Sequence, residues 1–176
     1  MISINIGLTG DRDDMELWFQ RAIEANPNNR DACLHKMEWL EPKWHGSPEE
    51  LLAFGRACRD SGNVRAGITL LSANAHWRFT QYLDPESTNR YFRSDSVIYE
   101  IMEVYQKYFD LFPSDNIERT NFAMYCALAG RINAAEVEFR AVGDDLLGSN
   151  LFPHDYILQI REFVAERAMD PADLDL

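Results

Sequence analysis

The stretch SPEELLAFGRACRDSGN, residues 47–63, predicts one complete α-helix together with the signals that start and stop it. Ser47 is suited to cap the first turn, Pro48 stands at the first helical position, and Glu50 follows three residues after the cap. The turn residues Ser-Gly-Asn at 61–63 end the segment. The stretch therefore indicates a chain built from helices that are separated by short turns.

Seven further helices are expected on either side of this segment, because apolar residues recur at helical spacing between turn signals. Their expected ranges are 13–25, 30–40, 64–82, 96–112, 115–130, 131–142 and 154–169. The longest polar connection, DPESTNRYFRSD at 84–95, is expected to be a loop. Together these segments predict an all-α fold.

The expected domain organisation is simple. Only Ile2, Ile4 and Ile6 alternate as a strand would, and one strand has no partner to pair with, so residues 1–12 are expected to be a lead-in. A single helical domain is predicted over 13–169, followed by a flexible acidic tail at 170–176. A chain of 176 residues is long enough for one core or a short repeat array.

An internal repeat is suggested by Phe19, Ala22 and Pro27, whose spacing resembles the second helix and exit turn of a tetratricopeptide repeat. In that pattern the aromatic ring fills the space between helices, alanine lets them approach, and proline ends the segment. The spacing recurs with substitutions in two later sets, Tyr105, Tyr108 and Pro113, then Ala123, Ala135 and Phe139. The pattern predicts a short α-solenoid of about four stacked antiparallel hairpins.

A closer resemblance covers residues 18–143 and rests on three stretches, PKWHGS at 42–47, LLSANAHWRF at 70–79 and YCALAGRINAAEVEFRAVGD at 125–144. They are similar to a bacterial domain family of unknown function, related to tetratricopeptide and Sel1-like proteins, that carries a Trp-Gly-Gly-Ser motif. His45 stands where that motif has glycine. The resemblance implies a helical-repeat fold and brings no activity with it.

The charge balance favours some partners over others. The chain has 17 basic and 29 acidic side chains, a net charge of −12, and residues 91–176 account for −9 of it. Phosphate backbones and anionic membranes repel such a protein, so neither nucleic acid nor membrane is an expected partner. A basic protein would be attracted, although solubility alone also explains the acidity.

The cysteine pattern and the lack of long apolar runs predict a cytoplasmic protein. Cys33, Cys58 and Cys126 are odd in number and widely spaced, which favours reduced thiols over disulfides. No stretch approaches the roughly 20 apolar residues that a membrane span needs. The opening MISINIGLTGDRDD lacks the basic and apolar regions of a secretory signal.

Familiar catalytic and cofactor motifs do not occur in this sequence. It has no phosphate-binding Gly-Lys-Ser/Thr loop and no GxSxG, HExxH or CxxC pattern. The four histidines are far apart and no two of them lie four residues from each other: His35, His45, His76 and His154. No cofactor, no metal site and no catalytic residue is therefore predicted.

Eight residues are candidates for contact with a partner: Trp44, His45, His76, Arg78, Arg90, Arg93, Asp144 and Asp145. Trp44 suits an exposed aromatic anchor, but the favoured interpretation is a plug that holds the 42–47 loop onto its helices. His76 could face a groove, but a structural bond to a neighbouring helix or to this loop is favoured.

The charged candidates have alternative interpretations too. Arg78, Arg90 and Arg93 alternate with aromatic residues and could line a carboxylate-binding pocket, or they could neutralise surrounding acids. Asp144 and Asp145 could receive a basic partner, with solvated surface as the default interpretation.

These observations predict a non-enzymatic module that binds a protein or peptide, in one version an immunity-type inhibitor of a basic partner. Two alternatives stay open. One is an enzyme with an unfamiliar site that combines His76 and Arg78 with Glu100 or Glu103. The other is a structural subunit of a larger assembly, and the sequence leaves the oligomeric state undetermined.

Overall fold

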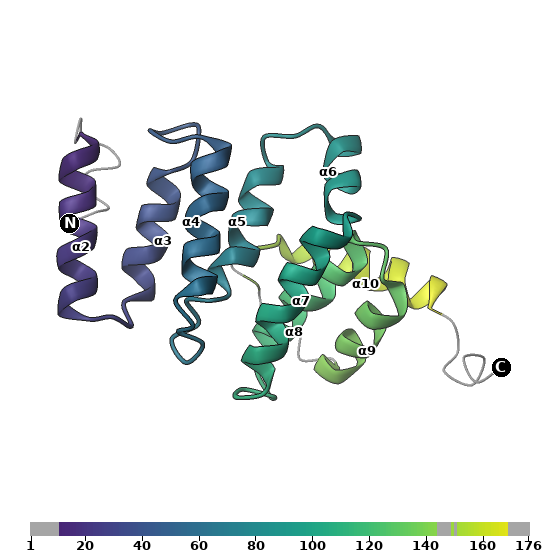
Figure 1. Ribbon diagram of the computed structural model, residues 1–176. Helices are drawn as coiled ribbons and strands as arrows, with labels where there is room; N and C mark the ends of the chain where they lie inside the picture. Colours follow the sequence, from purple (N-terminus) through teal and green to yellow (C-terminus); the bar gives the residue numbers. More distant parts are fainter. Residues whose placement is uncertain (1–10, 144–148, 150, 169–176) are drawn as a thin grey trace. The chain divides into compact units, whose positions relative to one another are not determined.

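The computed structural model describes residues 11–143, 149 and 151–168, and within them it has nine α-helices and no strand (Figure 1). The prediction of an all-α fold is confirmed. The chain divides into two compact units, Met1–Leu83 (unit 1) and Asp84–Leu176 (unit 2). The expectation of a single domain over 13–169 stays a prediction, and each unit is described by itself.

Unit 1 contains four helices that lie side by side in Figure 1: α2 (Arg12–Ala25), α3 (Arg30–Trp39), α4 (Pro48–Asp60) and α5 (Leu71–Thr80). The first three begin and end within one residue of their predicted ranges. At the start of α4 the Ser47 hydroxyl accepts the Glu50 backbone N–H at 3.2 Å, and Pro48 stands at the first position. The predicted helix start is therefore confirmed.

The core of unit 1 lies between α3, α4 and α5. Its buried members are Cys33, Met37, Leu51, Cys58, Ile68, Leu71 and Ala75. α4 and α5 approach so closely that a Cβ atom built on Gly55 would lie 2.5 Å from the Ala75 Cβ. Only glycine fits at this crossing, because real side chains do not approach to that distance.

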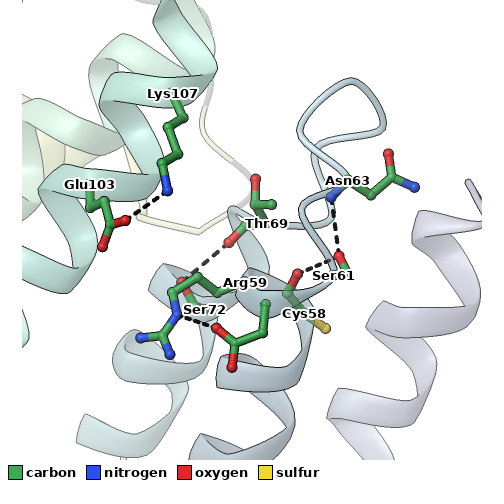
Figure 2. A network of polar contacts seen from close by, with 9 residues as sticks. Cys58, Arg59, Ser61, Asn63, Thr69, Ser72, Glu103 and Lys107 are labelled. Atoms are coloured by element: carbon green, nitrogen blue, oxygen red, sulfur yellow. Dashed lines mark hydrogen bonds and ion pairs between the residues drawn. The ribbon is translucent and has the colours of Figure 1, made fainter.

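The predicted helix over 64–82 is wrong in its first third, because residues 61–70 form turns and α5 starts at Leu71. Figure 2 shows how side chains hold these turns: the Ser61 hydroxyl donates to the Cys58 carbonyl at 2.6 Å and accepts the Asn63 N–H at 3.2 Å. The Ser72 hydroxyl donates to the Thr69 carbonyl at 3.2 Å. The apolar spacing misled because Ile68 and Leu70 are buried without being helical.

Unit 2 contains five described helices: α6 (Pro85–Phe92), α7 (Asp95–Phe109), α8 (Asn116–Leu128), α9 (Ile132–Val142) and α10 (His154–Arg167). α8 and α9 form a tightly packed hairpin through a turn at Gly130, whose φ of 74° is left-handed. α6, α7 and α10 each pack against α8.

The loop expected over 84–95 is wrong, because most of it forms α6. The Asp84 side chain accepts the Ser87 backbone N–H at 3.0 Å, and Pro85 stands at the first helical position. These are the same start signals as in α4. The segment was predicted to be a loop because it is mostly polar, and Phe92 is indeed the only buried residue of this helix.

The core of unit 2 is aromatic. The Tyr105 and Phe122 rings stack with centroids 5.0 Å apart, and the Tyr125 ring contacts Phe92 at 5.9 Å and Phe152 at 5.4 Å. The positions picked out by the repeat spacing on α8 and α9 are buried as well: Ala123, Ala135 and Phe139. The small side chains of Ala123 and Ala135 allow the close packing of the α8–α9 hairpin.

Candidate protein interface

Two of the predicted partner-binding residues belong to a loop in unit 1 that is fixed against α3. His45 stacks on the buried Trp39 ring with centroids 4.7 Å apart and an interplanar angle of 22°, and its backbone N–H donates to the Trp39 carbonyl at 3.3 Å. Gly46 lies against the preceding backbone, where a Cβ atom would stand 2.1 Å from the Leu40 carbonyl oxygen. His45 therefore serves to anchor the loop.

Glu41 organises the charges of this loop. Its side chain is only 7% exposed, and its carboxylate accepts from Arg78, from the Tyr82 hydroxyl at 2.9 Å and from the Lys43 ammonium at 3.1 Å. Burial, followed by the hydrogen bond to Glu41, raises the pKa of Tyr82 above its ordinary value. Arg78, predicted to meet a partner, thus satisfies a buried carboxylate of the same unit.

Trp44 and His76 differ in accessibility. Trp44 is 42% exposed, which is compatible with an exposed aromatic anchor, and the interpretation as a plug that holds the loop stays a prediction. His76 on α5 is 4% exposed and interacts within the chain, which agrees with the structural interpretation.

The other predicted residues belong to unit 2 or lie outside the description. Arg90 on α6 pairs with Glu86 at 2.7 Å in an exposed pair. Arg93 follows the last turn of α6 and lines a groove. Asp144 and Asp145 lie outside the described residues. Of the three predicted arginines, Arg78 is engaged by Glu41 in unit 1, Arg90 pairs with Glu86, and Arg93 lines a groove within unit 2.

One candidate binding surface is an apolar groove between α7 and α9, with α8 as its floor; we call it the α7/α9 groove. It encloses about 490 Å³ and is lined mainly by Tyr99, Met102, Phe122, Ala134 and Val137. Tyr99 is 58% exposed and Val137 is 63% exposed, unusually high for large apolar side chains. Such a surface favours contact with another apolar group.

Acidic side chains border the α7/α9 groove. Glu103 pairs with Lys107 at 2.7 Å in a solvent-exposed pair (Figure 2), and Glu138 pairs with Arg119. The wider field is acidic as well, since residues 84–176 carry 8 basic and 18 acidic side chains, a net charge of −10. The groove thus combines an apolar floor with a negatively charged surrounding.

A second groove of about 740 Å³ lies between α6, the α8–α9 turn and α10; we call it the Arg93 groove. Besides residues 127–132, which include Arg131, it is lined by Asn89, Arg93, Tyr156, Ile160 and Phe163. Its charged lining residues are both cationic, whereas the unit that contains it is acidic.

Sequence reasoning missed most residues of both grooves, although a weak signal existed. Tyr99 and Met102 are apolar yet fall outside the buried stripe of α7, which includes Val97, Ile101 and Val104. Apolar residues away from the core stripe of an amphipathic helix mark a second contact surface. Arg131 and Phe163 offered no comparable signal, because neighbours distant in sequence define their groove.

Comparison with known proteins found no matching family model, no matching curated protein and no matching solved structure. The resemblance to tetratricopeptide and Sel1-like repeats therefore stays a prediction. Among the described residues no helix is long and apolar enough to cross a membrane. The same part of the chain holds no group of three or more His, Cys, Asp or Glu side chains placed to bind a metal ion.

Proposed function

We propose that the protein is a helical interaction module that binds a protein or peptide partner through the α7/α9 groove without chemically transforming it. The observation that carries the proposal is the exposure of Tyr99 and Val137 over an apolar floor. Burial of such side chains by a partner removes apolar surface from water, which is the main favourable contribution to association.

The chemistry around the groove supports a partner that is both apolar and basic. Carboxylates of Glu103 and Glu138 stand at its rim, and the unit carries a net charge of −10. Exposed ion pairs such as Glu103–Lys107 contribute little in water, so a basic partner can compete with them. An acidic inhibitor that masks a basic toxin or enzyme would use the same surface.

The proposal includes the TPR-like solenoid suggested by the repeat spacing. The hairpin of α8 and α9 supports it, because the predicted small residues Ala123 and Ala135 are buried where the two helices pack closely. In such folds stacked hairpins leave extended grooves between neighbouring helices, and these grooves receive partners.

The test starts from a phage-displayed library of amphipathic helical peptides selected against the full chain, followed by fluorescence-anisotropy titration of the enriched peptides. We expect enriched peptides to carry an apolar face and Lys or Arg residues. Val137→Glu should weaken their binding about tenfold or more, because it places a charge where apolar surface must be buried.

Leu158→Glu is the matched control, since Leu158 is 44% exposed on α10 and lies outside both grooves. It introduces the same charge and should change the affinity less than about twofold. Binding should also weaken as the ionic strength rises from about 0.01 M to about 0.5 M. Equal losses in the two variants, or a library that yields no enriched peptide, would overturn the proposal.

A further inference from the structure

The Arg93 groove combines cationic and apolar lining residues, and this combination points to a particular ligand. Arg93 and Arg131 line it together with the apolar Leu128 and Ile132, and α10 contributes Tyr156, Ile160 and Phe163. A ligand that uses both kinds of lining joins an anionic group to an apolar body.

Arg93 is placed to receive an anion. It is exposed at the end of α6, and among the described residues it has no ion pair. Its guanidinium lies against the α8–α9 turn, where a Cβ atom on Gly130 would stand 3.9 Å from the Arg93 Nε. The planar donor fork is thus held beside the groove while its charge is left to solvent.

Arg131 supplies a second cation whose present partner can be exchanged. Its guanidinium pairs with the Asp95 carboxylate at 3.0 Å, and both side chains are exposed. An ion pair of this kind is worth little in water, so an incoming anion can replace Asp95 at small cost.

Part of the apolar lining is a stripe on one face of α10. Tyr156, Ile160 and Phe163 follow one another at helical spacing, and Phe163 keeps 40% of its surface exposed. Burial raises the pKa of Tyr156 above its ordinary value, and its phenolic hydroxyl is a hydrogen-bond donor.

We propose that the Arg93 groove binds a small amphipathic carboxylic acid, with its carboxylate on Arg93 and Arg131 and its apolar body on α10. Guanidinium forks match the planar carboxylate with paired hydrogen bonds. The volume of about 740 Å³ falls within the range of small-molecule sites. This site is separate from the α7/α9 groove, and it does not depend on the function proposed for that surface.

The test uses phenylpropionate as the probe and its neutral amide, phenylpropionamide, as the matched ligand, in amide NMR titrations of the full chain. We expect phenylpropionate to bind with a dissociation constant on the order of 1 mM or tighter and to shift the amide signals of residues 127–132 and 156–163. The amide should bind about tenfold more weakly, because it cannot form charge-assisted hydrogen bonds.

Arg93→Gln should weaken phenylpropionate binding about tenfold, whereas Arg90→Gln should leave it unchanged. The two arginines share α6, and Arg90 differs in being engaged by Glu86 outside the groove. Phe163→Ala should weaken phenylpropionate several-fold and leave acetate unaffected, since it removes only apolar contact.

Asp95→Asn tests whether Arg131 binds the ligand, because a purely structural role of Arg131 would not make binding stronger in this variant. Removal of the competing carboxylate should strengthen binding a few-fold, because Arg131 is released and a repulsion is lost. Equal affinities for the acid and the amide, or for the wild type and Arg93→Gln, would overturn the proposal. So would tighter binding of an acetylated and amidated Glu-Phe peptide, since the carboxylate would then belong to a protein partner.

Discussion

The two units differ in their balance of charged residues. Unit 1 has 9 basic and 11 acidic side chains, and its central carboxylate, Glu41, is buried against Arg78, Tyr82 and Lys43. Unit 2 has 8 basic and 18 acidic side chains, and its ion pairs include exposed ones such as Glu103–Lys107. Unit 1 is therefore nearly balanced in charge, with a net charge of −2 and one buried carboxylate, whereas unit 2 carries an excess of acidic side chains, with a net charge of −10.

The contrast separates structural from interacting surface. In unit 1 the loop 42–47 is held by the stacking of His45 on Trp39 and by the Glu41 contacts, so these residues serve the fold while Trp44 stays exposed. In unit 2 apolar side chains stay exposed beside acidic ones. Substitutions in the loop should therefore affect stability, and substitutions in the grooves should affect binding.

The largest effect is expected for Gly46→Ala in unit 1. The new Cβ would lie 2.1 Å from the Leu40 carbonyl oxygen, and this backbone atom cannot move without displacing the loop. We expect a loss of about 3 kcal/mol or more in the free energy of unfolding, together with exposure of Trp39. Urea denaturation followed by circular dichroism and tryptophan fluorescence measures both.

Gly62→Ala is the control for this substitution. Gly62 has a φ of 65°, but nothing lies within 4 Å of a Cβ atom built there, so only backbone strain of about 1 kcal/mol should appear. If both variants lose the same stability, close packing of the 42–47 loop does not hold it in place.

The next effect concerns the buried carboxylate. Arg78→Gln leaves Glu41 buried with fewer compensating charges, and we expect a cost of about 3 kcal/mol in the free energy of unfolding. The double variant Glu41→Gln with Arg78→Gln should be more stable than Arg78→Gln alone, because no charge is then left buried. Thermal and urea unfolding of the set provide the comparison.

Unit 2 offers the matched exposed pair for this experiment. Arg90→Gln breaks the exposed contact with Glu86 and should cost less than about 0.5 kcal/mol. A cost for Arg90→Gln as large as that for Arg78→Gln would contradict the division between internal and solvent-exposed charge.

The same contrast explains what the sequence could predict. The helix start at Ser47-Pro48 was predicted correctly because the capping side chain and its target lie within three residues. The same signal at Asp84-Pro85 was missed because the segment that follows is mostly polar. The range 64–82 failed because the buried Ile68 shares the helical spacing of Leu71 and Ala75 without belonging to the helix. The spacing of apolar residues indicates which residues are buried. It does not determine the backbone conformation of a buried turn, which depends on contacts that are distant in sequence.

The candidate sites were less predictable for the same reason. The motif residues Arg78 and His76 stood out by type, but a partner 37 residues away, Glu41, decides the role of Arg78. The groove residues Tyr99 and Val137 are ordinary amino acids in amphipathic helices. Their exposure follows from which faces the neighbouring helices leave uncovered, and periodicity alone does not specify that.

A smaller effect on stability is expected from the N-cap residues of α4 in unit 1 and α7 in unit 2. Ser47→Ala removes the hydrogen bond that caps α4, and we expect a loss of about 1 kcal/mol in the free energy of unfolding. Ser94 is the equivalent residue of α7, but its side chain makes no capping hydrogen bond. Ser94→Ala should therefore change the free energy of unfolding by less than about 0.5 kcal/mol. Urea denaturation distinguishes the two, and equal losses would show that the hydroxyl bond at α4 is not the source of the effect.

The smallest effect depends on pH and belongs to the ion pair between Arg12 and Glu50 in unit 1. The hydrogen bond from Arg12 at 2.6 Å lowers the pKa of Glu50 below its ordinary value. Its stabilising contribution is present above the unfolded-state pKa and is lost as the pH falls through the lower, folded-state pKa. The stability difference between wild type and Glu50→Gln should therefore shrink as the pH drops below the usual glutamate range. It should also shrink with added salt, since both side chains are exposed, and a difference that is constant with pH would show that the charge of Glu50 does not contribute.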